Sequence, residues 1–346
     1  LTAALAGAGV LTRGSVVASD ARPVGASSQV AHLAVRYSAD APSDAPAHLF
    51  LKVADPDLER RMPRRNRAEV AFYRAVAGDA RDLPLVRCYD AAYAGGDVDR
   101  FHLLLADPAA TTHVAIPYSA VPPPLAECHA MIDTLARVHA RYWDDPRPAA
   151  PLQQARSAER HTGMATAEFV AWADETLPRF LADLAEHLPA DRRALYAAVG
   201  ARLPARLVAC QARGRHLTLT HGDVHRGNFL FPRDAASHTP VIIDWKRAGV
   251  TLGANDLAYM MALCWFPPIR AQREQPLLRR YHERLREHGV AGYAWADLWD
   301  DYRLAVLRQL FEAVWGWSAR QNSLIWWNHL ERITAAITDL RCLAVV

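Results

Sequence analysis

The segment from His221 to Asn228 carries the side chains best suited to chemistry. It reads HGDVHRGN, so Asp223 and Asn228 stand five residues apart, and Asp244 follows within the sequence VIIDW. In phosphoryl transfer, one carboxylate accepts the proton of the attacking hydroxyl, while an amide oxygen and a second carboxylate hold magnesium. Magnesium takes few ligands from the protein, so one Asn and one Asp suffice. The spacing of these three side chains therefore suits phosphoryl transfer.

The same segment admits a second chemistry. His221, Asp223 and His225 alternate, and alternate residues of an extended segment point the same way. Two imidazoles and a carboxylate could then converge on zinc or manganese, as in a metal-dependent hydrolase. That interpretation leaves Asn228 and Asp244 without a role, so phosphoryl transfer is favoured.

A lysine and a glutamate in the first hundred residues form another candidate group. Lys52 is one of only two lysines among 40 basic residues, which indicates a need for a compact ammonium. Glu69 shares the face of a predicted helix with Phe72 and Tyr73, and a carboxylate on an apolar stripe needs a cation. We therefore predict that Lys52 and Glu69 pair and hold the ammonium toward nucleotide phosphates.

The elements that would position these residues differ along the chain. Alternation over residues 28–37 predicts a half-buried strand, HLFLKVA predicts a second strand that carries Lys52, and residues 84–106 predict further strands around a Gly95-Gly96 hairpin. Glu69 falls on a predicted helix over residues 66–77. The later part is mainly helical, with the patterns at 125–143, 165–188, 191–213 and from 256 onward, and with short strands HLTLTH, NFLF and VIIDW around the polar loop.

These motifs resemble a known family. HGDVHRGNFL followed by IIDW resembles the HGDxHxxN…IDW signature of aminoglycoside phosphotransferases, choline kinases and their relatives. LARVHARYW, GANDLAYM and the combination of HLFLKVA with NRAEVAFYR extend the resemblance over most of the chain, and LARVHARYW with the chain length favours the ecdysteroid-kinase-like branch. The resemblance implies an α+β, bilobal protein-kinase-like fold. Residues 1–107 would form a small, β-rich, nucleotide-binding N-lobe, and residues 108–346 a larger, mainly helical C-lobe with the catalytic loop, metal site and acceptor-binding helices.

The resemblance also implies a role for each motif residue. Asp223 would be the catalytic base, Asn228 and Asp244 would bind Mg²⁺, and His221 and Asp256 would give structural support to the loop. The family often has a Glu-Asp pair at the hinge, where this chain has Ala106-Asp107, so the hinge contacts stay open. ATP or GTP would be bound by the ion pair, a phosphate-covering loop and the hinge, that is, by Lys52, Glu69, Gly25, Ala26, Ser27, Ser28, Leu105, Ala106 and Asp107.

Three charged or titratable residues near these motifs have no assigned role. Arg226 is interpreted as a solvated loop residue rather than one that steers phosphate. Lys246 could contact a phosphate or the acceptor, or be a surface cation. The role of His225 outside the hydrolase alternative stays open.

Composition limits the other functions. The net charge of +3 is too small to indicate nucleic-acid binding, and the arginine cluster over residues 60–67 lacks interleaved aromatic side chains. Five cysteines without CxxC spacing favour reduced thiols in the cytoplasm, and the longest apolar stretch is too short to span a membrane. The oligomeric state stays open.

The expected function is that of an ATP-dependent small-molecule kinase. From Leu257 to Val346 the sequence has 11 Arg against 9 Asp plus Glu, whereas a pocket for polycationic aminoglycosides would be acidic. The acceptor is therefore expected to be a neutral or amphipathic alcohol, a sugar or an antibiotic-like natural product, with antibiotic resistance as one role that would follow. A nucleotide-binding pseudokinase is the non-enzymatic alternative. A protein kinase is disfavoured because IDW replaces DFG and no APE element follows.

Overall fold

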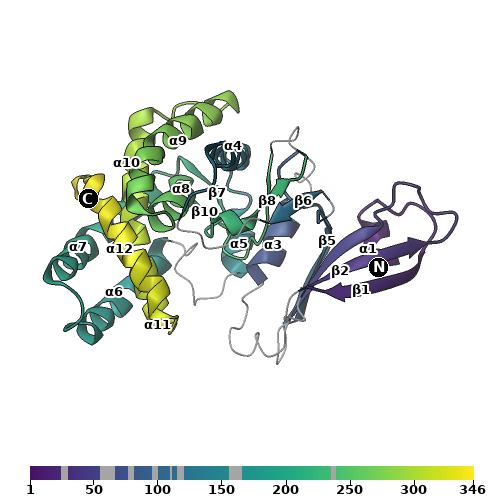
Figure 1. Ribbon diagram of the computed structural model, residues 1–346, viewed down its shortest axis with the longest axis horizontal. Coiled ribbons are helices and arrows are strands. Elements are labelled where there is room, and N and C mark those ends of the chain that lie inside the picture. Colours follow the sequence, from purple (N-terminus) through teal and green to yellow (C-terminus); the bar gives the residue numbers. More distant parts are fainter. Residues whose placement is uncertain are drawn as a thin grey trace. The chain divides into compact units, whose positions relative to one another are not determined.

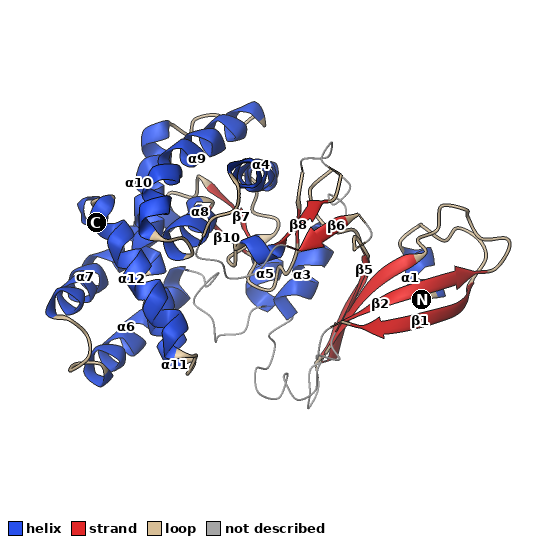
Figure 2. Ribbon diagram, viewed as in Figure 1, coloured by secondary structure: helices blue, strands red, loops and turns tan. Residues whose placement is uncertain are grey.

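The computed structural model describes residues 1–24, 30–54, 67–76, 82–95, 100–109, 111–114, 121–155, 166–234 and 239–346 (Figure 1). The chain divides into two compact units. The first comprises Leu1–His113, Gln154–Ser157 and Leu230–Lys246, and the second Val114–Gln153, Ala158–Phe229 and Arg247–Val346. Strands dominate the first unit and helices the second (Figure 2).

A five-stranded antiparallel sheet forms the frame of the first unit. Its order is β1 (Val16–Pro23), β2 (Val30–Tyr37), β3 (His48–Val53), β5 (Arg100–Ala106) and β4 (Cys88–Ala94). On β2, Leu33 and Val35 are buried while Ala34 and Arg36 are exposed, which confirms the predicted half-buried strand. Lys52 lies on β3, as predicted, and β5 carries Leu105 and Ala106 toward the hinge segment.

Strand β1 was not anticipated from the sequence. It reads VVASDARP and most of its residues are exposed, so it shows no alternation of apolar and polar residues. In the described part of the chain it is an edge strand paired with β2, which lets it tolerate Asp, Arg and Pro.

Helix α3 (Arg67–Val76) packs against β4 and β5 and confirms the predicted helix. It buries Val70, Phe72 and Val76 together with Glu69. The ring of Phe72 stacks on Trp245 at a centroid distance of 4.1 Å. This stacking joins the helix that carries Glu69 to the segment that carries Asp244. The short helix α1 (Thr2–Gly7) contributes Leu5 to a separate apolar cluster with Leu33, Val35, Leu49 and Leu104.

The three strands β6 (Thr112–Val114), β8 (Phe229–Pro232) and β9 (Val241–Ile242) form a small second sheet. The strand predicted over VIIDW is thus shorter than expected, because it ends at Ile242. Asp244 lies beyond it with φ 67°, a left-handed conformation that few residues other than glycine adopt. The backbone turns at Asp244 instead of continuing the strand.

The second unit is built from helices that confirm the helical patterns. Helix α4 packs on α9 and on β7, α8 on α10, and α11 on α6 and α12. Strands β7 (Leu217–Thr220) and β10 (Gly249–Leu252) pair beside them, and a π-helical turn, Tyr259–Leu263, follows α8. The helical elements are α4 (Leu125–Arg141), α5 (Ala149–Ala155), α6 (Thr166–Asp183), α7 (Ala190–Ala212), α8 (Ala254–Ala258), α9 (Pro267–Glu287), α10 (Trp295–Gln309), α11 (Phe311–Ser318) and α12 (Ser323–Asp339), with short 3₁₀ turns at Arg226–Asn228 and Cys342–Val345.

None of the helices in the described ranges combines the length and apolarity needed to cross a bilayer. All five cysteines have free thiols.

Candidate active site

The predicted lysine–glutamate pair forms within the first unit. Lys52 Nζ lies 2.6 Å from Glu69 Oε2 and 3.4 Å from Asp244 Oδ1. The Glu69 side chain is only 3% exposed, so the ammonium supplies the counter-charge that this buried carboxylate needs. Residues from β3, α3 and the segment after β9 thereby meet at one ammonium group.

Electrostatics keep this lysine charged. Burial alone would lower the pKa of Lys52, but the neighbouring carboxylates of Glu69 and Asp244 outweigh burial and raise the pKa above its ordinary value. A permanently cationic side chain is suited to holding phosphate oxygens.

Both lysines of the chain contact Asp244. Lys246 forms an ion pair with Asp244 Oδ2, while Lys52 approaches Oδ1. The Lys246 side chain is 15% exposed, so the interpretation of Lys246 as a surface cation is wrong. The two ammonium groups hold the Asp244 carboxylate in a defined orientation.

In the second unit, Asp256 anchors the backbone of the polar loop. Its Oδ2 accepts a hydrogen bond from the His221 N–H at 2.7 Å, and its Oδ1 accepts one from the Gly222 N–H at 2.8 Å. Asp256 is fully buried, and His139 Nε2 lies 3.2 Å from its Oδ2. Gly222 has φ 76°, and a Cβ atom there would lie 2.7 Å from the Arg247 carbonyl oxygen. The loop therefore needs glycine at this position.

Both loop histidines bind the loop backbone. His221 Nδ1 accepts from the Asp223 N–H and His225 Nδ1 accepts from the Gly227 N–H, each at 3.1 Å. Within the described ranges no three His, Cys, Asp or Glu side chains are grouped to hold a metal ion. The described structure therefore lacks the grouping of His221, Asp223 and His225 on which the hydrolase alternative depends.

Asn228 is oriented by the same loop. Its Nδ2 donates to the Asp223 carbonyl oxygen at 2.8 Å, which fixes the amide plane. The carbonyl end of the amide, Oδ1, is the hard oxygen ligand that magnesium prefers. Together with the Asp244 carboxylate, the chain thus carries donors of the type that suits this metal.

Asp223 is buried and has two partners that the sequence did not reveal. Its Oδ1 accepts the Tyr259 hydroxyl at 2.7 Å and lies 3.5 Å from Arg247 Nη1. Arg247 also approaches Glu312 Oε1 at 3.9 Å. A tyrosine inside the apolar run after GANDLA was the one available signal, because a buried hydroxyl requires a partner. Tyr259 begins the π-helical turn, and such turns are frequent at functional sites.

Arg226 is not the solvated loop residue that was expected. Its Nη2 and Nε lie 2.8 and 3.2 Å from Glu127 Oε2 on α4, and its side chain is half-buried. The planar guanidinium thus ties the loop to α4. The pair could not be predicted from the sequence, because Glu127 and Arg226 lie 99 positions apart.

The predicted hinge residues end strand β5. Leu105 is buried, and the Ala106 N–H donates to the Arg87 carbonyl oxygen at 2.8 Å. Asp107 accepts from the Ala109 N–H at 2.9 Å and pairs with His32. The predicted phosphate-covering residues Gly25, Ala26, Ser27 and Ser28 lie outside the described residues, as do the arginines of the 60–66 stretch.

A cavity of about 360 Å³ borders the polar loop in the second unit. It is lined by loop residues, by the π-helical turn and by the start of α12, and none of the described lining side chains is a carboxylate. The lining residues are Val121, Pro123, His225, Arg226, Tyr259, Cys264, Trp265, Leu324, Ile325, Asn328, His329 and Arg332.

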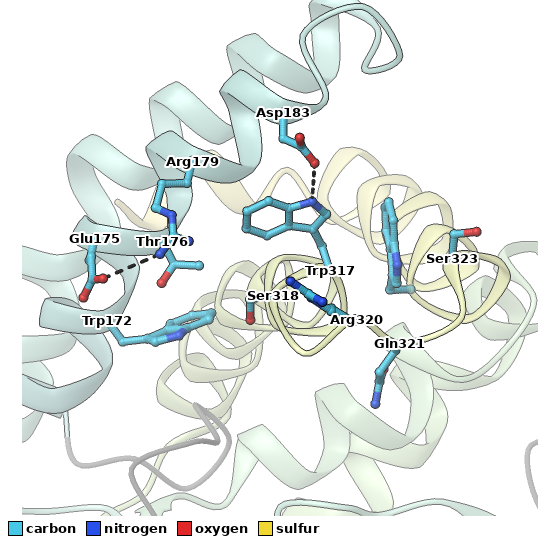
Figure 3. A pocket seen from close by; sticks show the side chains of 11 residues that line it. Trp172, Glu175, Thr176, Arg179, Asp183, Trp317, Ser318, Arg320, Gln321 and Ser323 are labelled. Atoms are coloured by element: carbon cyan, nitrogen blue, oxygen red, sulfur yellow. Dashed lines mark hydrogen bonds and ion pairs between the residues drawn. The ribbon is translucent and has the colours of Figure 1, made fainter. Parts of the chain in front are cut away.

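A larger cavity of about 770 Å³ lies between α6, α11 and the start of α12 (Figure 3). Trp172, Trp317 and Trp326 line it, and Trp317 Nε1 donates to Asp183 Oδ2 at 2.7 Å. Trp265, Trp315 and Trp326 are buried.

Comparison with known proteins gives a family and a fold. The model of the ecdysteroid kinase-like family matches residues 86–290, which is more than half of the chain. No curated protein matches the chain by sequence. A microcompartment-associated aminopropanol kinase is 14% identical with a TM-score of 0.53, over 93% of this chain and 91% of its own. A macrolide 2′-phosphotransferase from Brachybacterium faecium is 15% identical with a TM-score of 0.50, over 92% of this chain and 91% of its own. The fold is therefore the predicted α+β protein-kinase-like fold.

Proposed function

The chain belongs to the ecdysteroid kinase-like family, and from that premise we propose that it transfers the γ-phosphoryl group of ATP to a hydroxyl of a small molecule. The observation that carries the proposal is the convergence of Lys52, Glu69 and Asp244. A buried glutamate that holds a lysine beside a second carboxylate is an arrangement for binding a metal–nucleotide complex.

The predicted nucleotide and metal ligands would keep those roles. The Lys52 ammonium, fixed by Glu69, is available as a donor to phosphate oxygens. Asn228 and Asp244 have the oxygen donors that would hold Mg²⁺, which when bound neutralises phosphate charge. Residues 1–107, with the loop at Gly25–Ser28 and the hinge at Leu105–Asp107, form the proposed nucleotide-binding lobe, and residues 108–346 the proposed catalytic lobe.

Asp223 would act as the base. As the acceptor oxygen bonds to the γ-phosphorus, the hydroxyl proton passes to the Asp223 carboxylate. The bond from the γ-phosphorus to the bridging oxygen breaks, and ADP leaves. Tyr259 and Arg247 orient the carboxylate, and Asp256 and His221 hold the loop backbone. No covalent intermediate on the protein is required.

The acceptor is proposed to be a neutral or amphipathic alcohol, a sugar or an antibiotic-like natural product. The described lining of the loop cavity contains no carboxylate, which supports this, because a polycationic aminoglycoside would require acidic partners. The cytoplasm is the proposed location.

The test is a panel of hydroxylated metabolites and antibiotics assayed for ADP release with and without Mg²⁺. We expect Mg²⁺-dependent release that one acceptor class stimulates, and loss of that stimulation in Lys52→Met. If the purified protein neither binds ATP nor shows acceptor-stimulated turnover, the proposal is wrong. ATP binding without turnover would favour the pseudokinase alternative.

A further inference from the structure

The cavity beside the polar loop is connected to the proposed base by one side chain. Tyr259 lines the cavity, and its hydroxyl donates to Asp223 Oδ1 at 2.7 Å. His225 and Arg226, from the loop itself, also line it. A molecule in this cavity would therefore lie next to the residue that orients Asp223. Its volume, about 360 Å³, falls in the ordinary range for small-molecule sites, roughly 300–1,000 Å³.

One wall of the cavity is apolar and open to solvent. Val121, Leu324 and Ile325 line it with exposed fractions of 53%, 70% and 48%. Trp265 extends the wall, and the neighbouring Phe266 is 46% exposed. Large apolar side chains gathered at one place on a surface mark a binding site more often than scattered ones do. This wall fits the apolar body of a ligand.

Arg332, on α12, lies in the same lining. Its Nη1 donates to the Cys264 carbonyl oxygen at 3.2 Å, and its guanidinium lies 5.5 Å from the centre of the Phe266 ring. Among the residues that the structure describes, no carboxylate lies within ion-pair distance of it. Arg226, by contrast, is neutralised by Glu127. The half-buried guanidinium of Arg332 has five donors, and the described side chains of this lining offer it no counter-charge, so an anionic group is its natural partner.

The other polar side chains of the lining do not supply that charge. Burial lowers the pKa of His329 to about 4, so its imidazole is neutral near pH 7 and can donate or accept one hydrogen bond per nitrogen. Asn328 donates its amide to the Leu324 carbonyl oxygen at 2.6 Å.

The tryptophan-lined cavity of Figure 3 is a weaker candidate for the same ligand. Two carboxylates, Glu175 and Asp183, line it and would repel an anionic group; Glu175 pairs with Arg179 at 3.7 Å and Asp183 accepts from Trp317. None of its lining residues belongs to the polar loop or contacts Asp223 in the described contacts.

We propose that the cavity beside the polar loop is the acceptor site, and that it takes a hydroxyl compound with an apolar body and an anionic group that pairs with Arg332. This inference rests on the proposed kinase function. It narrows the acceptor to an anionic amphipathic alcohol, of which a hydroxy carboxylic acid is the simplest form.

The test compares ω-hydroxydodecanoate with its methyl ester, which has the same hydroxyl and apolar chain without the charge. With Mg²⁺ and ATP, the wild type should turn over the acid with a kcat/KM at least about tenfold above that of the ester, the gain of one charge-assisted pair. Arg332→Gln should abolish this preference by raising KM for the acid, and Arg332→Lys should restore part of it. The matched control is Arg320→Gln, the same change in the tryptophan-lined cavity, which should leave the preference intact.

Three results would overturn the inference. The first is an equal kcat/KM of the wild type for acid and ester, and the second is an equal loss of kcat/KM for both in Arg332→Gln. The third is an Arg332→Gln variant in which only the KM for ATP is raised, which would assign Arg332 to the nucleotide. Binding separates this failure from that of the kinase function. If the acid binds the wild type but not Arg332→Gln, and neither the probes nor any acceptor of the panel stimulates turnover, the kinase function fails and the ligand class stands. If neither probe binds, the inference is wrong.

Discussion

Asp244 is the residue on which the charges of the first unit converge. The scarcity of lysine in the sequence marked Lys52 as a candidate, and the apolar face of its helix marked Glu69 as a carboxylate in need of a cation. The pairing of Lys52 with Glu69 was therefore predictable. That Lys246 and Lys52 contact opposite oxygens of Asp244 was not, because Lys52 and Asp244 are 192 positions apart. Nor did the sequence indicate the left-handed backbone at Asp244. A pattern of residue types carries no information about such distant contacts.

Replacing Glu69 with Gln tests the role of the buried pair. The variant keeps the shape of the side chain but removes its charge, so Lys52 depends on Asp244 alone. We expect the Kd for Mg²⁺–ATP to rise about tenfold and the free energy of unfolding to fall by about 1–3 kcal/mol. Calorimetric titration and denaturant unfolding measure these quantities. Arg74→Gln, an exposed change on the same helix, is the control and should change both quantities little. If Glu69→Gln changes them as little as Arg74→Gln does, the role assigned to Glu69 is wrong.

Tyr259→Phe tests the orientation of Asp223. The change removes one hydroxyl that donates at 2.7 Å and leaves the ring in place. We expect kcat to fall about tenfold, which corresponds to about 1.4 kcal/mol, while KM for ATP stays unchanged. Steady-state kinetics separate the two constants. A raised KM for ATP with unchanged kcat would mean that Tyr259 serves the nucleotide instead.

We predict that His329 makes the stability of the chain depend on pH. Burial lowers its pKa from 6.5 to about 4, so between these values the unfolded chain binds a proton that the native state does not. Above pH 6.5 His329 does not affect the free energy of unfolding. As the pH falls from 6.5 to about 4, the free energy of unfolding decreases by at most about 3 kcal/mol. His329→Gln should flatten this part of the curve of unfolding free energy against pH, whereas exposed His48→Gln should not. Parallel curves for His329→Gln and the wild type would refute this account.

At the scale of elements, the periodicity of apolar residues predicted the strands and helices that bury one regular face. Strands β2 and β3, helix α3 and the long helices of the second unit follow the expected segments because each buries one regular face. Strand β1 was not predicted, because an exposed edge strand needs no alternation of apolar and polar residues. Strand β9 is shorter than the predicted strand, because the chain turns at Asp244. The motif residues of the polar loop were found from the sequence, whereas its partners Tyr259, Arg247 and Glu127 were not, since they depend on how helices pack.

The polar loop depends on a glycine where two segments approach closely. In Gly222→Ala, the positive φ is strained and the new Cβ meets the Arg247 carbonyl oxygen at 2.7 Å. We expect a loss of more than about 2 kcal/mol of unfolding free energy, together with lower kcat. Gly214→Ala is the matched control, because its φ of 60° is similar and nothing lies within 4 Å, so it should cost about 1 kcal/mol. Equal losses in denaturant unfolding would show that the close approach does not matter.

At the scale of the whole molecule, the evidence for function comes from different parts of the chain. The family match over residues 86–290 includes Asp223, Asn228, Asp244 and Asp256. It begins after Lys52 and Glu69, which it therefore does not include. The lysine–glutamate pair is therefore independent evidence, because it comes from the geometry of the first unit and not from the matched segment. The assignment of nucleotide binding to residues 1–107 stays a prediction.

The central claim is that the whole chain transfers a phosphoryl group with Asp223 as the base. Its most direct test follows radiolabel from the γ-phosphate of ATP into the acceptor that best stimulates ADP release, in wild type and in Asp223→Asn. We predict transfer by the wild type only with Mg²⁺, and a loss of about 100- to 10,000-fold in Asp223→Asn with the Kd for Mg²⁺–ATP unchanged. Transfer by Asp223→Asn at the wild-type rate would contradict the claim.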